Sequence, residues 1–470
     1  MSAGSSLNPL IFRAYDIRGE VGSDLTPELV ELIGRAYATH LRREYDSNAI
    51  ALTRDNRPSS LSLRDGFVRG VLAAGVSVTD IGVAPSPLMY FVAASQSFGG
   101  GVAVTASHSP THMNGLKLLE LDGIPLAPEA IQAVYGIARE GDFESGQGQV
   151  DQCAASPEYL AMLEQRFALE RPLRVVADPG NGVATLTGPD ALRRIGCEVE
   201  VINGESDGTF PKHLPNPQDP ATMAELCETV PTRGADFGIA WDGDGDRLGL
   251  VDERGQRREA DELLAVFARD ALRRHPGGQI LVDVKTSLSA IRDIEAHGGM
   301  VVMGPTGHSL GKRAMREQGY LFGGEAAAHF YFAENFNLDD AVYAACALAR
   351  LADRSGAATS ELFAGIPSFI TSPELGLPCD DALKFQVASG VAERFAATRQ
   401  VLAIDGARIE FPDEGNGEGW ALVRASNTGP ALTLRFEATS ERRFEEIRRE
   451  VLVDLSRFTD LAVPSELGAR

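Results

Sequence analysis

The amino-acid sequence predicts an α/β fold in which three similar mixed α/β sandwich units precede a distinct α+β domain. Short apolar runs typical of strands alternate with longer segments whose apolar residues recur at helical spacing. The order strand, helix, strand, helix, strand and polar loop occurs three times, and the C-terminal part follows another order. Such alternation is typical of layered sheets with largely parallel strands. A chain of 470 residues has room for several domains, and we expect four, at 1–150, 151–256, 257–367 and 368–470.

The first unit follows a short N-terminal segment. Residues 9–19 read as a short strand and a turn, and residues 28–43 predict an amphipathic helix. The elements expected next are a strand at 49–53, a helix after Ser60, a helix end passing into a strand at 74–78, a helix at 87–97 and a strand at 102–105. The unit closes with a polar loop at 105–110, which contains Ser107.

The second and third units repeat this order. The second is expected to have strands at 173–177, 196–201 and 237–240, helices at 189–195 and 222–230, and a closing loop at 242–247. The third is expected to have strands at 280–284, 298–302 and 320–322, helices at 289–297 and 310–318, and a closing loop at 324–329. Any α/β chain looks somewhat repetitive, but here a polar loop falls at the same place in every unit, which favours a true repeat.

The last domain has a different pattern. Residues 365–378 are rich in loop-forming residues and predict a linker. The expected elements are helices at 381–397 and 441–458 and strands at 401–404, 408–411, 420–423 and 432–437.

Composition excludes several classes of protein. A hydrophobic content of 44% is that of a soluble globular protein, and no apolar run is long enough to span a membrane. The net charge of −22 argues against nucleic acid or an anionic membrane as partner, because both require a cationic face. Five scattered cysteines and an N-terminus without signal-peptide features suggest neither a disulfide framework nor a zinc site, and a cytoplasmic location is expected. Nothing in the sequence indicates an obligate protein partner.

Ser107 is the first candidate functional residue. It lies in the loop after an apolar strand, beside His108 and ten residues before Lys117. A hydroxyl at a strand end with a lysine nearby can carry a phosphoryl or acyl group. The alternative is a solvated turn without chemical function.

The sequence Asp-Gly-Asp-Gly-Asp-Arg at 242–247 predicts a metal site. Carboxylates at alternate positions repel one another unless a cation lies between them, and the glycines allow the backbone to bring them together. Oxygen ligands select Mg²⁺ or Ca²⁺ over zinc. The following apolar residues read as a strand, which argues against a calcium loop of the EF-hand type. The alternative is a solvated acidic turn.

Two further loops carry polar groups suited to a phosphosugar. The loop at 424–429 gathers a guanidinium, two hydroxyls and an amide, a typical cradle for an anion, although a hairpin turn would look similar. Glu325 and His329 could contact sugar hydroxyls, or Glu325 could merely cap a helix. Local positive charge would come from Lys117, Arg18, Arg247, Lys285 and His308.

Taken together and in this order, the loops resemble those of the α-D-phosphohexomutase superfamily, most closely its phosphomannomutase/phosphoglucomutase group. The resemblance covers essentially the whole chain. Loop 105–110 resembles the phosphoserine loop, 242–247 the metal loop, 324–329 the sugar loop and 424–428 the phosphate loop. Further family-like stretches occur at 12–19, 211–217 and 307–309.

The resemblance implies four domains around a central cleft and a two-step reaction. Phosphoserine 107 would donate its phosphoryl group to O6 of a mannose or glucose 1-phosphate, and the resulting 1,6-bisphosphate would turn over and return the group from O1. A hexose 1,6-bisphosphate would act as activator. The implied Mg²⁺ ligands are Ser107, Asp242, Asp244 and Asp246, and the implied catalytic residues are Ser107, Lys117, Arg18, His308 and Arg247. The implied substrate-binding residues are Tyr15, Lys285, Glu325, His329, Arg424, Ser426, Asn427 and Thr428.

The sequence departs from the family pattern at several positions. Ala327 stands where the sugar loop usually has a serine, so one hydroxyl contact worth ~1 kcal/mol is lost and the sugar preference is open. Ala328 replaces a common glycine, Ser109 a common asparagine and Asn56 a common glycine. The rival readings are a phosphoglucosamine mutase, a phosphatase, and a relative that binds phosphosugars without turning them over.

Overall fold

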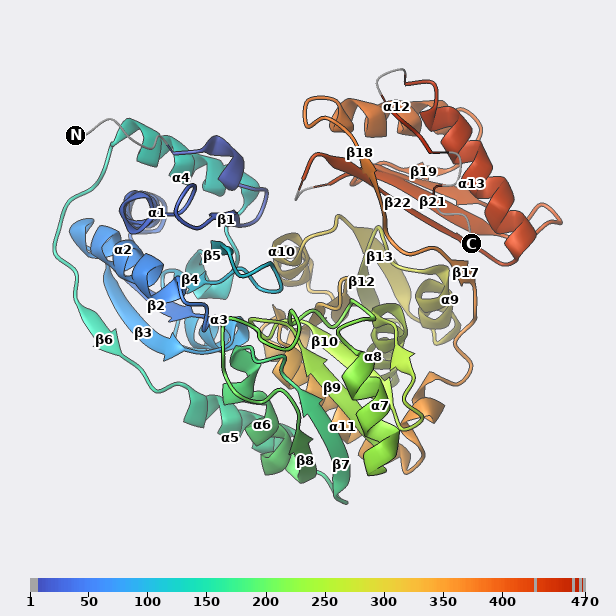
Figure 1. The fold of residues 1–470 in the computed structure, drawn as a ribbon, viewed down its shortest axis with the longest axis horizontal. Helices are drawn as coiled ribbons and strands as arrows, with labels where there is room; N and C mark the ends of the chain where they lie inside the picture. Colours follow the sequence, from blue (N-terminus) through green and yellow to red (C-terminus); the bar gives the residue numbers. More distant parts are fainter. Residues whose placement is uncertain (1–6, 427–428, 459–460, 465–466, 468–470) are drawn as a thin grey trace. The chain divides into compact units, whose positions relative to one another are not determined.

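The computed structural model describes residues 7–426, 429–458, 461–464 and 467. Two compact units make up the chain. The first contains the residues up to 263 together with 308–322 and 327–364, and the second contains 264–307, 323–326 and the residues from 365 onward. Helices and strands alternate along the chain, so the predicted α/β class is confirmed (Figure 1).

The first unit begins with a six-stranded sheet in the order β1-β5-β4-β2-β3-β6. Its strands are β1 (Ile17–Glu20), β2 (Ala49–Arg54), β3 (Ser77–Val83), β4 (Gly101–Val104), β5 (Met113–Leu119) and β6 (Val150–Gln152). Its helices are α1 (Pro27–Tyr45), α2 (Ser60–Ala73), α3 (Ser86–Ser95) and α4 (Pro128–Glu140), with short 3₁₀ turns at Pro9–Ile11 and Leu121–Gly123. Apolar side chains of α1, α2 and α4 share one core with the sheet.

The second sheet has five strands in the order β11-β10-β9-β7-β8. The strands are β7 (Leu173–Asp178), β8 (Cys197–Val201), β9 (Phe237–Trp241), β10 (Leu248–Asp252) and β11 (Arg257–Arg258). The accompanying helices are α5 (Ser156–Phe167), α6 (Gly188–Ile195) and α7 (Ala224–Arg233), with a 3₁₀ turn at Val183–Leu186. β7 pairs in parallel with β8 and β9, as in the first sheet β2 pairs with β3 and β4.

The third repeat contributes elements to both units. The first unit holds α10 (His308–Gln318), β15 (Phe330–Phe332), β16 (Leu338–Asp339) and α11 (Ala341–Ser355), with 3₁₀ turns at Ala333–Asn335 and Thr359–Phe363. The second unit holds the parallel pair β12 (Gln279–Asp283) and β13 (Met300–Gly304) and the helix α9 (Leu288–Ala296). The helix α8 (Ala260–Arg274) and the strand β14 (Phe322–Gly324) each span the point of division.

The C-terminal region of the second unit is an antiparallel sheet covered by two helices (Figure 1). Its strands are β17 (Ile370–Thr371), β18 (Leu375–Pro378), β19 (Val401–Leu402), β20 (Ala407–Phe411), β21 (Gly419–Ala425) and β22 (Ala431–Ala438). The helices α12 (Lys384–Ala396) and α13 (Glu441–Leu455) bury one face. On the opposite face Trp420 and Leu422 pack against Val284 and Leu288 of the same unit.

Some sequence expectations are wrong in detail. Pro9–Ile11 forms a 3₁₀ turn rather than a strand, because proline suits a first helical position and the side chain of Asn8 accepts a hydrogen bond from the Leu10 N–H. The expected linker contains β17 and β18, which both pair with β22. The sheets are also less parallel than expected, since β1, β5 and β10 pair antiparallel with their neighbours. Among the described residues, none of the helices combines the length and apolar character that a membrane span requires.

Candidate active site

Two polar loops meet in the first unit. The loop at 105–110, called here the Ser107 loop, follows β4, and the loop at 242–247, called here the aspartate loop, follows β9. Each of these strands is followed by an antiparallel partner, so each loop reverses the chain at the carboxyl end of a central strand. The Ser107 Oγ donates a hydrogen bond of 2.5 Å to Asp242 Oδ2. The two strongest motifs of the sequence therefore lie in direct contact.

The aspartate loop is folded around Asp242. Its Oδ1 accepts hydrogen bonds from the backbone N–H groups of Gly245 at 3.0 Å, Asp246 at 3.0 Å and Arg247 at 3.2 Å. Gly245 has φ +78°, a left-handed conformation that glycine adopts without steric cost. One ligand atom from each of Asp242, Asp244 and Asp246 lies within 4.8 Å of the other two. The carboxylates converge as the alternating spacing predicts.

These three carboxylates fit a divalent cation. All are buried, and within the described part of the chain the Oδ1 atoms of Asp244 and Asp246 have no hydrogen-bond partner. Burial, reinforced by the charges of Asp246 and Asp244, raises the pKa of Asp242 well above its usual value. A cation between the carboxylates would satisfy these oxygens and remove the repulsion between them. The cluster can therefore hold a metal ion with oxygen ligands.

Lys117 connects the aspartates to the first sheet. It lies on β5 opposite Ala103 of β4, and its Nζ donates to Asp244 Oδ2 at 2.6 Å and to Asp246 Oδ2 at 2.5 Å. Burial alone would lower the pKa of Lys117, but the charges of Asp244 and Asp246 raise it well above its usual value. Lys117 is therefore a fixed positive charge beside the cluster.

Arg18 and His108 both contact hydroxyls of the Ser107 loop. The His108 Nδ1 lies 3.1 Å from Ser107 Oγ, and the charge of Arg247, together with burial, lowers the pKa of His108 well below its usual value. The Arg18 Nη1 donates to Ser109 Oγ at 3.0 Å. Ser109, where the family pattern has asparagine, thus provides an acceptor for Arg18.

The helix α10 carries His308 at its first position. Arg313 donates to Glu120 at 2.7 Å and Arg316 donates to Asp122 at 2.8 Å, which ties α10 to the segment after β5. These ion pairs explain why α10 belongs to the first unit together with the Ser107 loop.

His308 and His329 form a stacked pair beside the aspartate loop. Their ring centroids are 5.3 Å apart, and the ring of Tyr15 meets His308 edge-on at 5.5 Å. The Arg247 Nε donates to His329 Nε2 at 3.0 Å. Because a guanidinium only donates, the His329 Nε2 is the acceptor of this hydrogen bond.

Asp339 lies beside both histidines. Its Oδ2 lies 3.0 Å from His329 Nδ1 and 3.6 Å from His308 Nδ1, and its Oδ1 accepts a bond of 2.6 Å from Lys312. Burial opposes ionisation of Asp339, but the charge of Lys312 and the contact with His329 hold its pKa below the usual value. Asp339 and Lys312 were not singled out from the sequence.

The predicted phosphate-binding residues lie in the second unit. Lys285 Nζ forms an ion pair of 2.6 Å with Glu374. Arg424, on the same face of β21 as Trp420, contacts Asp405 Oδ2 through Nε at 3.2 Å and Nη2 at 3.1 Å. The Ser426 carbonyl accepts a hydrogen bond of 2.7 Å from Lys384. Asn427 and Thr428 lie outside the described residues.

The sugar loop also belongs partly to the second unit. Glu325 is buried with 3% exposure, and the neighbouring Ala326 N–H donates to Asp283 at 3.3 Å. Ala328 has φ +67°, a left-handed conformation that costs a residue with a Cβ about 1–2 kcal/mol. This strain explains why a glycine suits that position.

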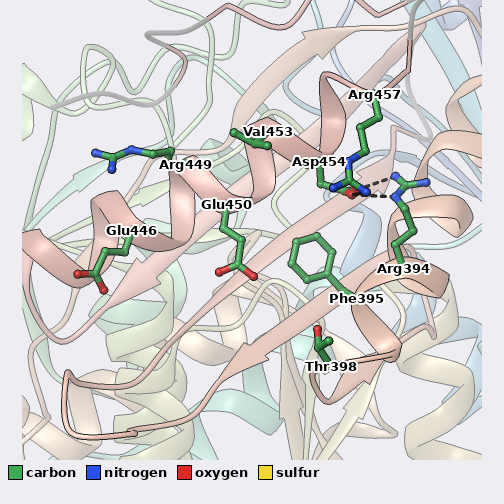
Figure 2. A pocket seen from close by; sticks show the side chains of 9 residues that line it. All are labelled: Arg394, Phe395, Thr398, Glu446, Arg449, Glu450, Val453, Asp454 and Arg457. Carbon is green, nitrogen blue, oxygen red and sulfur yellow. Dashed lines mark hydrogen bonds and ion pairs between the residues drawn. The ribbon is translucent and has the colours of Figure 1, made fainter.

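A separate hollow of about 440 Å³ lies between α12 and α13 in the second unit, and Figure 2 shows the side chains that line it. Arg394 forms two hydrogen bonds of 2.7 and 2.6 Å with Asp454 there, and Glu450 pairs with Arg399 at 2.9 Å. These charges compensate one another, so the hollow offers no concentrated charge for a phosphosugar.

Comparison with known proteins identifies the family of the chain. Sequence models of the phosphoglucomutase/phosphomannomutase family match in four consecutive parts: alpha/beta/alpha domain I at 9–145, domain II at 157–255, domain III at 259–369 and the C-terminal domain at 377–452. The chain belongs to the phosphoglucomutase/phosphomannomutase family. Membership confirms the resemblance to the α-D-phosphohexomutase superfamily and the four-domain α/β architecture.

Individual relatives cover almost the whole chain. A phosphomannomutase/phosphoglucomutase from Pseudomonas aeruginosa is 38% identical over 441 residues, which are 93% of this chain and 94% of the relative. A phosphoglucomutase from Neisseria meningitidis is 38% identical over 446 residues, 94% of this chain and 95% of the relative. The crystal structure of a family protein from Burkholderia thailandensis superposes with a TM-score of 0.88 at 34% identity, covering 97% of this chain and 100% of that one.

Proposed function

We propose that the protein transfers a phosphoryl group reversibly between O1 and O6 of a hexose phosphate, with mannose or glucose 1-phosphate as substrate. The observation that carries this proposal is the buried Ser107 hydroxyl, bonded to Asp242 in a carboxylate cluster whose charge Lys117 compensates in part. Relatives 38% identical that are named phosphomannomutase/phosphoglucomutase and phosphoglucomutase support it.

In this proposal Ser107 carries the phosphoryl group. Its hydroxyl attacks phosphorus or leaves from it, and Asp242, within hydrogen-bond distance, can accept the hydroxyl proton. Transfer of a phosphoryl group depends mostly on positioning and on neutralising charge. Lys117, Arg18 and Arg247 provide positive charge around the Ser107 loop, and His308 is a candidate for proton transfer to the sugar oxygen.

Mg²⁺ is the metal proposed for the aspartate loop. Asp242, Asp244, Asp246 and the phosphorylated Ser107 would hold it, and the ion would supply charge neutralisation on the transferring group. A hexose 1,6-bisphosphate would phosphorylate Ser107 and so act as activator. We propose a cytoplasmic location for the reaction, as expected from the sequence.

The phosphate that is not transferred would bind in the second unit. Lys285, Arg424, Ser426, Asn427 and Thr428 are the proposed contacts, and Tyr15, Glu325 and His329 would meet the sugar. Arg424 and Lys285 already bind carboxylates of the chain, Asp405 and Glu374, which supports an affinity for anions. We propose four domains with the boundaries expected from the sequence.

A phosphorus NMR assay tests the reaction. Purified protein with Mg²⁺ and a trace of glucose 1,6-bisphosphate should convert mannose and glucose 1-phosphates into 6-phosphates, and Ser107→Ala should not. Release of inorganic phosphate as the main product would instead indicate a phosphatase. Glucosamine 1-phosphate serves as a third substrate, because a relative from Methanopyrus kandleri that is 35% identical is named a probable phosphoglucosamine mutase. Faster turnover of glucosamine 1-phosphate would overturn the sugar assignment and leave the phosphoryl chemistry in place.

A further inference from the structure

Arg57 is a buried arginine directly beneath the Ser107 loop. It lies between β2 and α2, and its side chain is 0% exposed. Its Nη2 donates to the carbonyl oxygens of Ser107 at 2.7 Å and Ser109 at 2.6 Å. Its Nη1 donates to the carbonyl oxygens of Pro110 at 2.8 Å and Met113 at 3.3 Å.

The Nε donor of Arg57 also has a hydrogen-bond acceptor. Its Nε donates to Asp55 Oδ2 at 3.1 Å, so each of the five N–H donors of a guanidinium has an acceptor. Four of these acceptors are backbone carbonyls of one short segment, 107–113. A lysine offers three donors on a single nitrogen and cannot reproduce this planar arrangement.

The backbone of Ser107 needs such support. Its φ is +53°, a left-handed conformation that costs a residue other than glycine about 1–2 kcal/mol. The aspartate loop also approaches closely, since a Cβ at Gly243 would lie 2.3 Å from the Ser107 carbonyl oxygen. The Ser107 peptide is therefore held in a strained position between Arg57 and Gly243.

Hydrogen bonds close a ring through the same residues. Asp55 Oδ2, which accepts from Arg57, also accepts from Thr105 Oγ1 at 2.8 Å. Thr105 Oγ1 in turn accepts from the Ser107 N–H at 2.9 Å. Arg57, Asp55, Thr105 and Ser107 thus form a closed circuit that fixes both the N–H and the carbonyl of Ser107.

We propose that Arg57 is a positioning residue that holds the Ser107 backbone so that Oγ stays at hydrogen-bond distance from Asp242. This inference rests on the proposed role of Ser107 as phosphoryl carrier. Arg57 acts through the loop, because its donors are occupied by the chain itself. Thr105 supports the same arrangement from the N–H side.

Kinetics of the variant Arg57→Lys test the proposal in the full-length protein. A displacement of a reacting group by about 1 Å can cost on the order of a hundredfold in rate. We therefore expect kcat with glucose 1-phosphate and Mg²⁺ to fall by about that factor, while KM changes by less than about threefold because the sugar contacts remain. Thr105→Val, which keeps the side-chain volume and removes only the hydroxyl, should lower kcat by about tenfold.

Arg394→Lys is the matched control. It removes the guanidinium of another arginine whose donors are bonded, here in two hydrogen bonds to Asp454 (Figure 2), and this pair does not involve the Ser107 loop. It should lower thermal stability and leave kcat per folded molecule unchanged. Wild-type kcat in both Arg57→Lys and Thr105→Val would overturn the proposal, and if Arg57→Lys does not fold, wild-type kcat in Thr105→Val alone is sufficient to overturn it.

Hydrogen exchange separates this inference from the proposed function. Peptides covering 105–113 should exchange faster in Arg57→Lys than in wild-type protein, and unchanged exchange would refute the positioning role. Wild-type protein that neither interconverts hexose phosphates nor accepts a phosphoryl group at Ser107 would refute the proposed function, whatever the exchange shows.

Discussion

The proposed carrier region and the proposed grip region differ in how far their charged side chains are exposed to water. The carrier region comprises the Ser107 loop, the aspartate loop and Lys117, and the grip region comprises Lys285, Glu374, Asp405, Arg424 and Ser426. In the carrier region Lys117 is 5% exposed and its partner Asp244 is 1% exposed. In the grip region the partner of Lys285, Glu374, is 46% exposed, and the partner of Arg424, Asp405, is 18% exposed.

This difference in exposure separates ion pairs that must stay formed from ion pairs that a substrate can replace. A buried charge that loses its partner has no access to water. Removing one charged residue of the carrier region therefore destabilises the others. A carboxylate that reaches water, as Glu374 does and Asp405 does in part, can be released into solvent at lower cost. The ion pairs of the grip region can therefore give way to a substrate phosphate, whereas those of the carrier region cannot.

The largest expected effect is on folding. Lys117→Met leaves Asp244 and Asp246 buried without their cation and should lower the free energy of unfolding by about 3–5 kcal/mol in the presence of a chelator. Lys285→Met should cost less than about 1 kcal/mol, because Glu374 reaches water.

Tryptophan fluorescence during urea denaturation can separate the two effects. Trp241 lies in the first unit and Trp420 in the second, and both are buried, so replacing either one by Phe leaves a single reporter in the other unit. Equal destabilisation by Lys117→Met and Lys285→Met would remove the distinction between the regions.

Metal dependence should be confined to the carrier region. Asp244→Asn removes one proposed ligand charge, and the Mg²⁺ concentration for half-maximal activity should rise at least about tenfold. Asp405→Asn, a matched change in the grip region, should leave the Mg²⁺ dependence unchanged. A Mg²⁺ titration of the activity after chelation makes the comparison, and an identical titration curve for Asp244→Asn and wild type would exclude this residue as a ligand.

A smaller effect is expected in the grip region. Although burial opposes it, the charges of Lys285, Arg435 and Arg424 hold the pKa of Glu374 below its usual value, so this carboxylate competes with a substrate phosphate for the same cations. Glu374→Gln should lower KM for glucose 1-phosphate by about two- to fivefold and leave kcat unchanged. Glu450→Gln serves as a control on the same domain. A raised KM in Glu374→Gln would show that Glu374 assists binding.

The smallest expected effect is on the pH dependence of thermal stability. The hydrogen bond to Asp178 raises the pKa of His213, which belongs to the family-like stretch at 211–217, against the effect of burial. Because the folded pKa lies above the unfolded value of about 6.5, the pair stabilises fully below that pH and loses this stabilisation as the pH rises through the folded pKa. His213→Gln should therefore lower Tm more at pH 5.5 than at pH 8. An equal loss of Tm at both pH values would contradict this linkage.

Periodicity predicts the repeated elements because each strand or helix has one consistent apolar face. The helix at 28–43 and the strand at 49–53 correspond to α1 and β2 within a few residues. Elements missed include β5, which carries Lys117 but follows a polar loop, and β18, a short strand that ends in Pro378. Their pairing depends on neighbours distant in the sequence, which local pattern does not report.

The candidate site shows the same limit. The Ser107 and aspartate loops were predictable because their small residues and alternating carboxylates are unusual in sequence. Arg57, Asp339 and Lys312 were missed, because a buried charged side chain whose contacts are distant in the sequence looks in sequence like any surface charge. For Arg57 the available signal was its position two residues after Asp55 and next to Asn56, where the sequence departs from the family pattern.

The most direct test of the central claim is phosphopeptide mapping by mass spectrometry after incubation with glucose 1,6-bisphosphate and Mg²⁺. We expect one phosphoryl group per chain, located at Ser107 and absent from Ser107→Ala. Phosphorylation at another residue, or none in a protein that still interconverts hexose phosphates, would contradict it.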